Sequence, residues 1–312
     1  MYCIKKIISE TFTRVYRSFF PLRKMTGKLL LFFIIIFSNP LTAQFVEIGF
    51  NIAGTTYQGD ISPLKYRFSF QGTQFGYGIN LGYHVSDKFS FRVSYSQGQI
   101  QASDRYAVDP WRRNRNLNFR TKIYEWAVTT DIFFLEYYKF FRKYNLKPFI
   151  RTGIAYFSFN PQGSYDGKWY DLQPLTTEGQ GLPGSDKQPY ALQQIAVPLG
   201  FGLAYDLNEY FRVSLDVTPR ITFTDYLDDV STDYPDFDLL REERGDMAVN
   251  LSYKGNLLPN GIKLEDFVKE GRGNSKDNDW YIFSSVSVSL LFDPILERKK
   301  RKSLNGARKC VF

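Results

Sequence analysis

The sequence of 312 residues has very little cysteine, histidine or methionine. It contains one histidine, three methionines and two cysteines, which are Cys3 and Cys310. Because these cysteines stand at the extreme ends of the chain, no disulfide framework can clip the region between them. One histidine and two distant cysteines also cannot supply a zinc site or the base of a Ser-His-Asp triad. We therefore predict no catalytic residue, no metal ligand and no cofactor.

Long apolar runs are also scarce. After the first 45 residues no run reaches the length of a membrane-spanning helix, which excludes a polytopic helical membrane protein. The one early run, Leu29–Phe37, follows Met25 and Lys28 and precedes the small-residue end at Ala43. This order is typical of a secretory signal peptide, which we predict over residues 25–43 with cleavage before Gln44.

Residues 1–24 lie unusually far upstream for a signal peptide. We interpret them as an extension from a mis-assigned start, with Met25 as the true initiator. A long n-region or a signal anchor is the alternative.

The formal net charge of +8 comes from the two ends of the chain. Residues 1–43 and 293–312 each hold 7 of the 40 Lys and Arg residues, and the region between them holds 26 basic and 29 acidic residues. A nucleic-acid-binding domain is therefore not predicted. The basic segment 293–312 is expected to be a solvated, disordered tail, with an acidic partner or anionic headgroups as the alternative.

Aromatic residues, in contrast, make up 18% of the chain. From Phe45 onward, apolar residues alternate with small or polar ones, the pattern of strands with one apolar face. We predict about eight strands of this kind, at Val46–Tyr57, Gln74–His84, Phe89–Ser96, Thr121–Phe134, Lys147–Phe157, Ile195–Tyr205, Phe211–Phe223 and Trp280–Phe292. Ten strands are possible if Met247–Tyr253 belongs to a hidden hairpin.

The connections between these strands alternate between short and long. Short turns on one side and long polar loops on the other are typical of a transmembrane β-barrel. We therefore predict an all-β fold over residues 44–292, an antiparallel up-and-down outer-membrane barrel with long extracellular loops and short periplasmic turns. Its surroundings would be outer-membrane lipid and lipopolysaccharide.

Strand parity also predicts the contents of the barrel. Eight strands enclose a lumen wide enough only for side chains. The inward face should carry four acids and four bases that pair with one another: Glu47, Arg92, Glu125, Asp131, Arg151, Arg212, Asp216 and Arg220. A satisfied structural network is the favoured interpretation, a proton or solute path the alternative, and an open porin is not expected.

Few residues outside the strands suggest chemistry. His84 lies at the periplasmic end of its strand and is interpreted as a turn or lumen residue. The acidic stretch that begins at Asp225 lacks the glycine and final glutamate of an EF-hand loop, so we expect loop solvation or partner contact there rather than calcium. Trp111–Arg115 is interpreted as an external loop touching lipopolysaccharide phosphates, and Gly271–Asn274 as a tight loop.

Three segments carry a resemblance to a known family. They are Gly54–Asp60 (GTTYQGD), Ile221–Asp236 (ITFTDYLDDVSTDYPD) and Arg272–Phe292 (RGNSKDNDWYIFSSVSVSLLF). Together they resemble the Bacteroidetes outer-membrane barrel family that includes PorG of the type IX secretion system. The resemblance spans residues 45–292. It implies a non-enzymatic barrel associated with the periplasmic ring of PorK and PorN.

The resemblance also suggests where partners would bind. A periplasmic ring would meet the turns at Ser86, Tyr138, Tyr144, Leu207 and Asn208. The DYLDDV motif, a candidate external loop site, consists of Asp225, Tyr226, Leu227, Asp228, Asp229 and Val230. We therefore expect a structural or interaction component of a secretion or envelope complex. The alternative is a barrel whose external loops bind glycan, lipopolysaccharide or a surface partner.

Overall fold

A computed structural model of the chain describes residues 45–63, 71–134, 146–255 and 271–292. The predicted extension 1–24, signal peptide 25–43 and tail 293–312 lie outside the described residues, as do Tyr138 and Tyr144. Eight long strands form a barrel: β1 (Phe45–Gln58), β2 (Gln74–His84), β3 (Phe89–Ser103), β4 (Asn118–Phe133), β5 (Leu146–Tyr165), β7 (Gln193–Asp206), β8 (Phe211–Thr222) and β9 (Trp280–Phe292).

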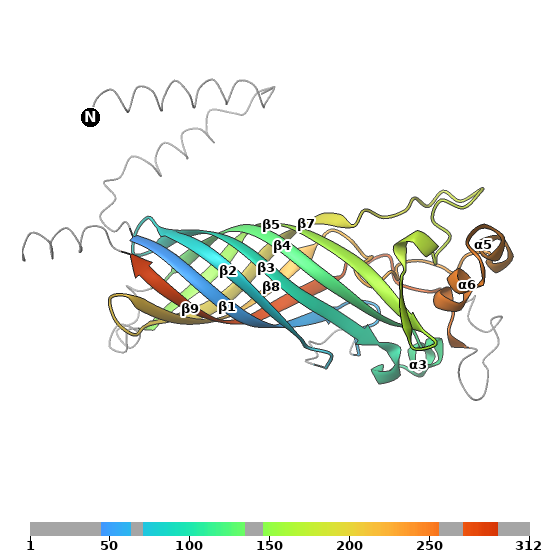
Figure 1. Cartoon of the computed structure of the whole chain (residues 1–312), viewed down its shortest axis with the longest axis horizontal. Coiled ribbons are helices and arrows are strands. Elements are labelled where there is room, and N and C mark those ends of the chain that lie inside the picture. Colours follow the sequence, from blue (N-terminus) through green and yellow to red (C-terminus); the bar gives the residue numbers. More distant parts are fainter. Residues whose placement is uncertain (1–44, 64–70, 135–145, 256–270, 293–312) are drawn as a thin grey trace, which may run out of the picture. The chain divides into compact units, whose positions relative to one another are not determined.

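The strands form one closed antiparallel ring (Figure 1). They follow the order β4-β3-β2-β1-β9-β8-β7-β5, and a β4–β5 pairing completes the circle. The first and last strands pair directly, with Val46 opposite Phe292. A ninth, short strand, β6 (Lys168–Asp171), only extends the outer end of β5 as a hairpin. The predicted eight-stranded up-and-down barrel is therefore confirmed.

Two strands are longer than the sequence predicts. β3 continues to Ser103 rather than Ser96, and β5 continues to Tyr165 rather than Phe157. In these extensions the outward positions are polar, as at Gln99 and Gln162. The alternation of apolar and polar residues fades where a strand leaves the lipid, although its backbone pairing continues.

All the regular helices of the described chain lie in the long connections at one end of the barrel (Figure 1). These elements are η1 (Asp104–Tyr106), α3 (Pro110–Arg115), η2 (Gln173–Leu175), α5 (Phe237–Arg244) and α6 (Asp246–Ser252). The segment Met247–Tyr253, considered for a hairpin, is thus largely helix α6, and the ten-strand alternative is wrong. The long-connection end is the extracellular one and the short-turn end is periplasmic.

The helix α5 begins and ends at typical capping residues. The side chain of Asp236 accepts hydrogen bonds from the backbone N–H groups of Asp238 and Leu239, at 3.0 and 3.2 Å. Gly245 ends the helix with a φ of 83°, which glycine adopts without steric cost. Within the described part of the chain, none of the helices is long and apolar enough to cross a bilayer.

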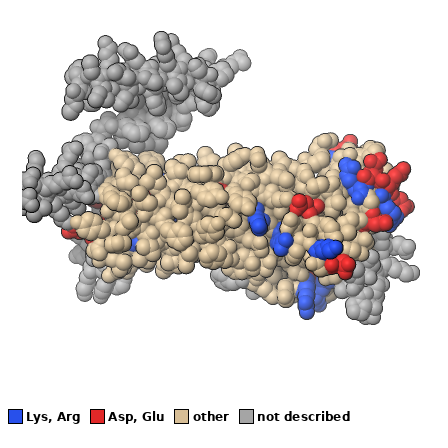
Figure 2. Space-filling model, in the orientation of Figure 1, with Lys and Arg blue, Asp and Glu red and all other residues tan. Residues whose placement is uncertain are grey.

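The outer wall of the barrel is apolar. Ile79 is 59% exposed, Trp126 58% and Phe201 67%, and many aromatic and aliphatic side chains point the same way. Figure 2 shows a wall almost without charge over most of the barrel, with basic and acidic side chains gathering toward the end that carries α3, α5 and α6. A continuous apolar belt of this kind is suited to lipid rather than water. The fold is that of a transmembrane barrel.

Candidate functional site

The periplasmic half of the lumen is filled by ion pairs, which we call the lower lumen network. Glu47 contacts Arg92 at 3.0 Å and Arg212 at 3.1 Å. Asp131 contacts Arg92 at 3.2 Å and Arg151 at 2.7 Å. Arg151 also reaches Asp216 at 3.2 Å, so the network alternates acid and base across five strands.

Farther up the lumen, Glu125 and Arg220 form a separate pair. The Arg220 Nε and Nη2 donate to the two Glu125 oxygens at 3.0 and 2.8 Å, and the Tyr281 hydroxyl donates to Oε2 at 2.7 Å. All eight residues that parity predicted to face inward therefore do so, and each is paired. The one histidine, His84, lies in the lumen as well, 2.8 Å from Glu47.

The DYLDDV motif closes the extracellular opening of the barrel; we call Asp225–Val230 the mouth plug. Leu227 and Val230 are fully buried in a cluster with aromatic residues of the barrel wall, including Phe119 and Phe157. The Thr121 hydroxyl of β4 donates to the Leu227 carbonyl at 3.0 Å. The motif lies at the end that carries the long connections, but its acids do not serve solvation, because Asp228 and Asp229 are buried.

One side of the mouth plug holds a carboxyl cluster, made of Asp60, Asp225, Asp228 and Asp279 around Tyr57. The Tyr57 hydroxyl lies 2.5 Å from Asp228 Oδ2 and 2.8 Å from Asp279 Oδ1. Because it has one proton, it can donate to only one of them. Backbone N–H groups also donate hydrogen bonds to the two carboxyls: Val230 donates to Asp228 at 2.9 Å, and Leu227 donates to Asp279 at 2.9 Å.

Burial dominates the titration of this cluster. It raises the pKa of Asp225 to about 9, with the charge of Asp228 adding to the effect. It also raises the pKa of Asp228 to about 8, to which Asp60 contributes and which Arg115 opposes. The pKa of Asp279 is raised for the same reasons, by burial and then by Asp228 and Asp225. At neutral pH the negative charge of the carboxyl cluster is therefore neutralised more by bound protons than by neighbouring cationic side chains.

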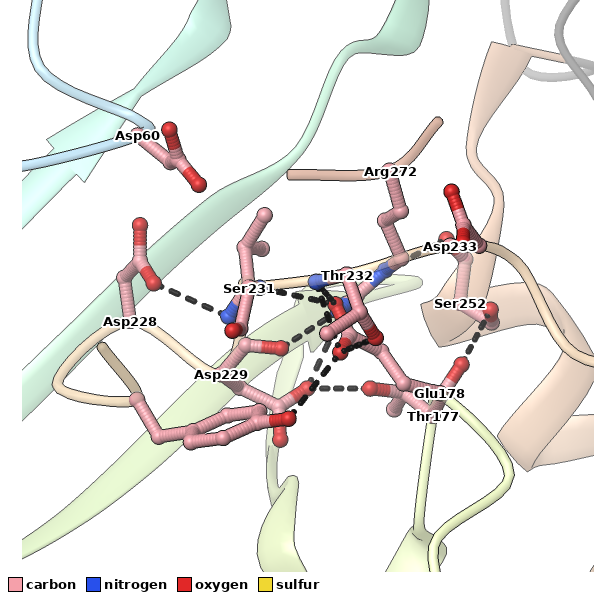
Figure 3. A network of polar contacts seen from close by, with 12 residues as sticks. Asp60, Thr177, Glu178, Asp228, Asp229, Ser231, Thr232, Asp233, Ser252 and Arg272 are labelled. Atoms are coloured by element: carbon pink, nitrogen blue, oxygen red, sulfur yellow. Dashed lines mark hydrogen bonds and ion pairs between the residues drawn. The ribbon is translucent and has the colours of Figure 1, made fainter. Parts of the chain in front are cut away.

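The other side of the mouth plug is held by Glu178 and Arg272 (Figure 3). Glu178 accepts from the Ser231 N–H at 2.8 Å, from the Thr232 hydroxyl at 2.6 Å and from Arg272 Nη1 at 2.9 Å. Arg272 also reaches Asp229 Oδ2 at 3.3 Å and donates to the Asp229 carbonyl. Two loops, the connection before β7 and the connection between β8 and β9, are thereby joined around one buried guanidinium.

Asp229 is tightly constrained in this arrangement. Its φ is 69°, in the left-handed region that Asp and Asn tolerate better than other non-glycine residues. Its carboxyl accepts from the Tyr190 hydroxyl at 2.6 Å and from the Thr177 hydroxyl. Burial raises its pKa to about 6, against the opposing charge of Arg272.

Further hydrogen bonds fix the second extracellular loop, which connects β3 and β4. Arg115 donates to Asp104 through Nε and Nη2 at 2.7 and 2.9 Å, and it also donates to the Arg272 carbonyl. Arg112 donates to the Ser62 carbonyl at 2.6 Å. Both arginines are buried, so the prediction that Trp111–Arg115 as a whole touches lipopolysaccharide is wrong for these two residues.

The predicted periplasmic contacts are separate from the mouth. The Ser86 side chain accepts from the backbone N–H groups of Lys88 and Phe89, and Asn208 accepts from those of Tyr210 and Phe211. Each side chain therefore shapes a tight turn. Leu207, beside Asn208, is 56% exposed.

Sequence reasoning missed Glu178, Arg272, Arg115 and Asp104, which hold the mouth plug in place. None has a periodic pattern around it. The local signals are the stretch Trp111–Arg115 and the turn at Gly271–Asn274, where Gly271 has a φ of 75°. That turn, predicted as a tight loop, places Arg272 in the interior of the mouth.

This arrangement fills the mouth and the lumen of the barrel with side chains. Among the described residues, no group of three or more His, Cys, Asp or Glu side chains has a geometry that could hold a metal ion. The lumen retains a small cavity of about 20 Å³. It is lined by Arg92, Arg151, Asp216 and Arg220, among others. That is room for about one water.

Comparisons with solved structures return outer-membrane proteins at low identity. Neisserial surface protein A is 10% identical with a TM-score of 0.37, over 78% of this chain and 96% of that one. Ail of Yersinia pestis, solved in complex with the heparin analogue sucrose octasulfate, is 7% identical with a TM-score of 0.37, over 80% and 100%. A major outer membrane protein of Thermus thermophilus is 12% identical with a TM-score of 0.37, over 80% and 100%.

Two further comparisons used the sequence. The comparison with curated proteins gives no match. A family model described as "Domain of unknown function (DUF6089)" matches residues 26–254, which is more than half of the chain. The protein belongs to the DUF6089 family.

Proposed function

We propose that the protein is a non-enzymatic, non-conducting outer-membrane barrel that acts as a structural or interaction component of a secretion or envelope complex. The observation that carries this proposal is the closed lumen. The lower lumen network fills one half of the barrel, and the mouth plug closes the other. A barrel without a path for solutes serves as a rigid anchor whose working surfaces lie at its two ends.

The type IX secretion system is the machine that the sequence resemblance suggests. In that setting, periplasmic ring proteins comparable to PorK and PorN would contact the turns at Ser86 and at Leu207–Asn208. The hydrogen bonds that Ser86 and Asn208 make within these turns support the proposal, because a preformed turn loses little entropy on binding.

A second candidate function is recognition by the extracellular cap, of glycan, lipopolysaccharide or a surface partner. The observation in its favour is that the long loops are ordered by buried ion pairs, such as Arg272 with Glu178 and Arg115 with Asp104. Helix α5 and its neighbours present exposed charged side chains on this fixed base.

Conductance in planar bilayers tests the closed lumen. Wild-type protein should pass almost no current. An Arg272→Met variant leaves Glu178 and Asp229 without their base, and we expect it to open the mouth to flickering current. The Arg241→Met variant is the matched control, because Arg241 is exposed on α5. Steady porin-like current through the wild type would contradict the proposal.

Site-specific cross-linking tests the complex and separates the two candidates. In a background with Cys3→Ser and Cys310→Ser, single cysteines are placed at Asp87 in a periplasmic turn and at Glu242 on α5, both exposed. Cross-links from Asp87→Cys to periplasmic ring proteins support the secretion complex. Cross-links only from Glu242→Cys support the external function. No cross-link from either, with the heat-shifted gel band of a folded barrel, would overturn the complex.

A further inference from the structure

Basic side chains on the outer wall of the barrel strands are confined to few places. Arg92, Arg151, Arg212 and Arg220 face the lumen. Of the remaining Lys and Arg residues in the eight described barrel strands, Lys147 lies at the periplasmic end, 2.6 Å from Asp206. The other two, Arg120 and Lys122, lie together on β4 at the extracellular end.

The position of this pair relative to the apolar belt is well defined. Along the outward face of β4, the exposed residues Val128, Trp126 and Tyr124 come first, and Lys122 and Arg120 follow directly. Aromatic residues mark the boundary between hydrocarbon and headgroups in membrane barrels. Arg120 and Lys122 therefore lie at the level of the outer-leaflet headgroups, where lipid phosphates are found.

The wall is hollowed at this point, and we call the depression the outer hollow. Its volume is about 490 Å³, within the range typical of small-molecule sites. It is lined by Arg120, Lys122, Tyr124, Ser158, Asn160 and Gln193, among others. Asn160 Oδ1 is buried there and accepts no hydrogen bond from any described residue. The lining thus combines two cations with amide and hydroxyl groups suited to sugar hydroxyls.

Arg120 is held in a fixed orientation within the outer hollow. Its guanidinium lies 4.3 Å from the ring centroid of Trp169 on the β6 hairpin, and its Nε donates to Gln162 Oε1 at 2.9 Å. The Gln162 side chain in turn donates to Asp171 Oδ1 at 2.7 Å, so this oxygen of the nearby carboxylate already accepts a hydrogen bond. The two terminal nitrogens of Arg120 donate to no described residue. Fixed nitrogens of this kind suit a phosphate, which arginine binds through paired hydrogen bonds.

We propose that the outer hollow binds the phosphorylated sugar headgroup of an outer-leaflet glycolipid. Arg120 and Lys122 contact the phosphate, and the amides of Asn160 and Gln193 contact sugar hydroxyls. The proposal rests on the proposed outer-membrane location, and it adds a specific lipid site to it.

Binding of purified diphosphorylated lipid A to the full-length protein in detergent, followed by native mass spectrometry, tests the site. The Arg120→Gln/Lys122→Gln double variant should lose roughly tenfold or more in affinity, since each charged hydrogen bond is strong. The control is Arg105→Gln/Arg244→Gln, which removes the same charge from exposed positions in the cap. It should bind as the wild type does.

Three outcomes would overturn the proposal. Equal loss in both double variants would show unspecific attraction. Unchanged binding by dephosphorylated lipid A would exclude phosphate recognition. Complete competition by millimolar inorganic phosphate would indicate a site for the free anion rather than for a headgroup. The conductance and cross-linking measurements do not depend on Arg120 or Lys122, so failure here is distinguishable from failure of the proposed function.

Discussion

The lower lumen network and the carboxyl cluster both bury acidic side chains, but they neutralise them in different ways. In the lower lumen network, Glu47 and Asp131 each contact two arginines. In the carboxyl cluster, Asp228 and Asp279 share one tyrosine hydroxyl, and burial raises the pKa of both. The lower lumen network therefore depends on ion pairs, whereas the carboxyl cluster depends on retained protons. The two regions should respond differently to mutation and to pH.

The largest effect is expected from breaking an ion pair in the lumen. Arg220→Leu leaves the buried Glu125 with only the Tyr281 hydroxyl. Removing one partner of a buried pair typically costs about 3–5 kcal/mol. We expect a loss of this order in the free energy of unfolding, measured by urea titration in lipid vesicles. The Glu125→Gln/Arg220→Leu double variant should recover most of it, and equal instability of both variants would contradict the interpretation.

The second effect is a dependence on pH that belongs to the mouth. Asp228 and Asp225 have pKa values raised to about 8 and about 9, so the folded protein binds their protons more tightly than the unfolded chain does. The contribution of these two protons to the free energy of unfolding is therefore fully present below the unfolded pKa of about 3.9. This contribution decreases as the pH rises and is lost above about pH 9.

The Asp228→Asn variant sharpens this test. Asparagine is neutral at every pH and keeps the shape of the protonated acid, so the slope should decrease by about one proton between pH 5 and 8. Unfolding is followed by heat-modifiability gels across that range. Arg115, the cation acting on Asp228, stays charged throughout. An unchanged slope would show that Asp228 is ionised in the folded barrel.

Removing a hydroxyl from the carboxyl cluster should have a smaller effect. Tyr57→Phe deletes the donor that lies between Asp228 and Asp279. A buried acceptor left without its partner costs about 1–3 kcal/mol. Tyr77→Phe is the control, because its hydroxyl donates to Gln97 on the exposed wall. Protease sensitivity of the extracellular loops should rise for Tyr57→Phe and not for Tyr77→Phe.

The smallest effect is expected on the surface of the cap. Asp238 and Arg241 on α5 form a 3.0 Å ion pair, but the Asp238 side chain is 96% exposed. Exposed pairs contribute about 0–1 kcal/mol. Asp238→Asn should therefore leave the urea midpoint nearly unchanged. A large loss would mean that the cap is coupled to the barrel through α5.

The barrel could be predicted from the sequence because strands have a period of two. Once Phe75 and Tyr77 are assigned to the lipid, Asn80 and His84 must face the lumen, and the same parity places Glu47 and Arg220 inside. This reasoning cannot predict the positions of residues in loops, where the sequence has no such periodicity. Arg272 and Glu178 lie 94 residues apart, so no local pattern relates them.

The mouth plug shows a second limit of the sequence. The acids of DYLDDV are indistinguishable by residue type from Asp233, Asp236 and Asp238 that follow them. The structure buries Asp225, Asp228 and Asp229 and leaves the other three exposed. What separates the two sets is the presence of Leu227 and Val230, whose burial among aromatic residues carries the neighbouring acids into the barrel.

The closing strand β9 has a consequence for assembly. Until Trp280–Phe292 is in place, both β1 and β8 are open edges, and open edges invite pairing with other chains. The mouth is also incomplete at this stage, because Asp279 and Arg272 directly precede β9 in the chain. Both defects disappear in one step when β9 pairs on its two sides. A chain that lacks β9 therefore has two unpaired strand edges and an incomplete mouth at the same time.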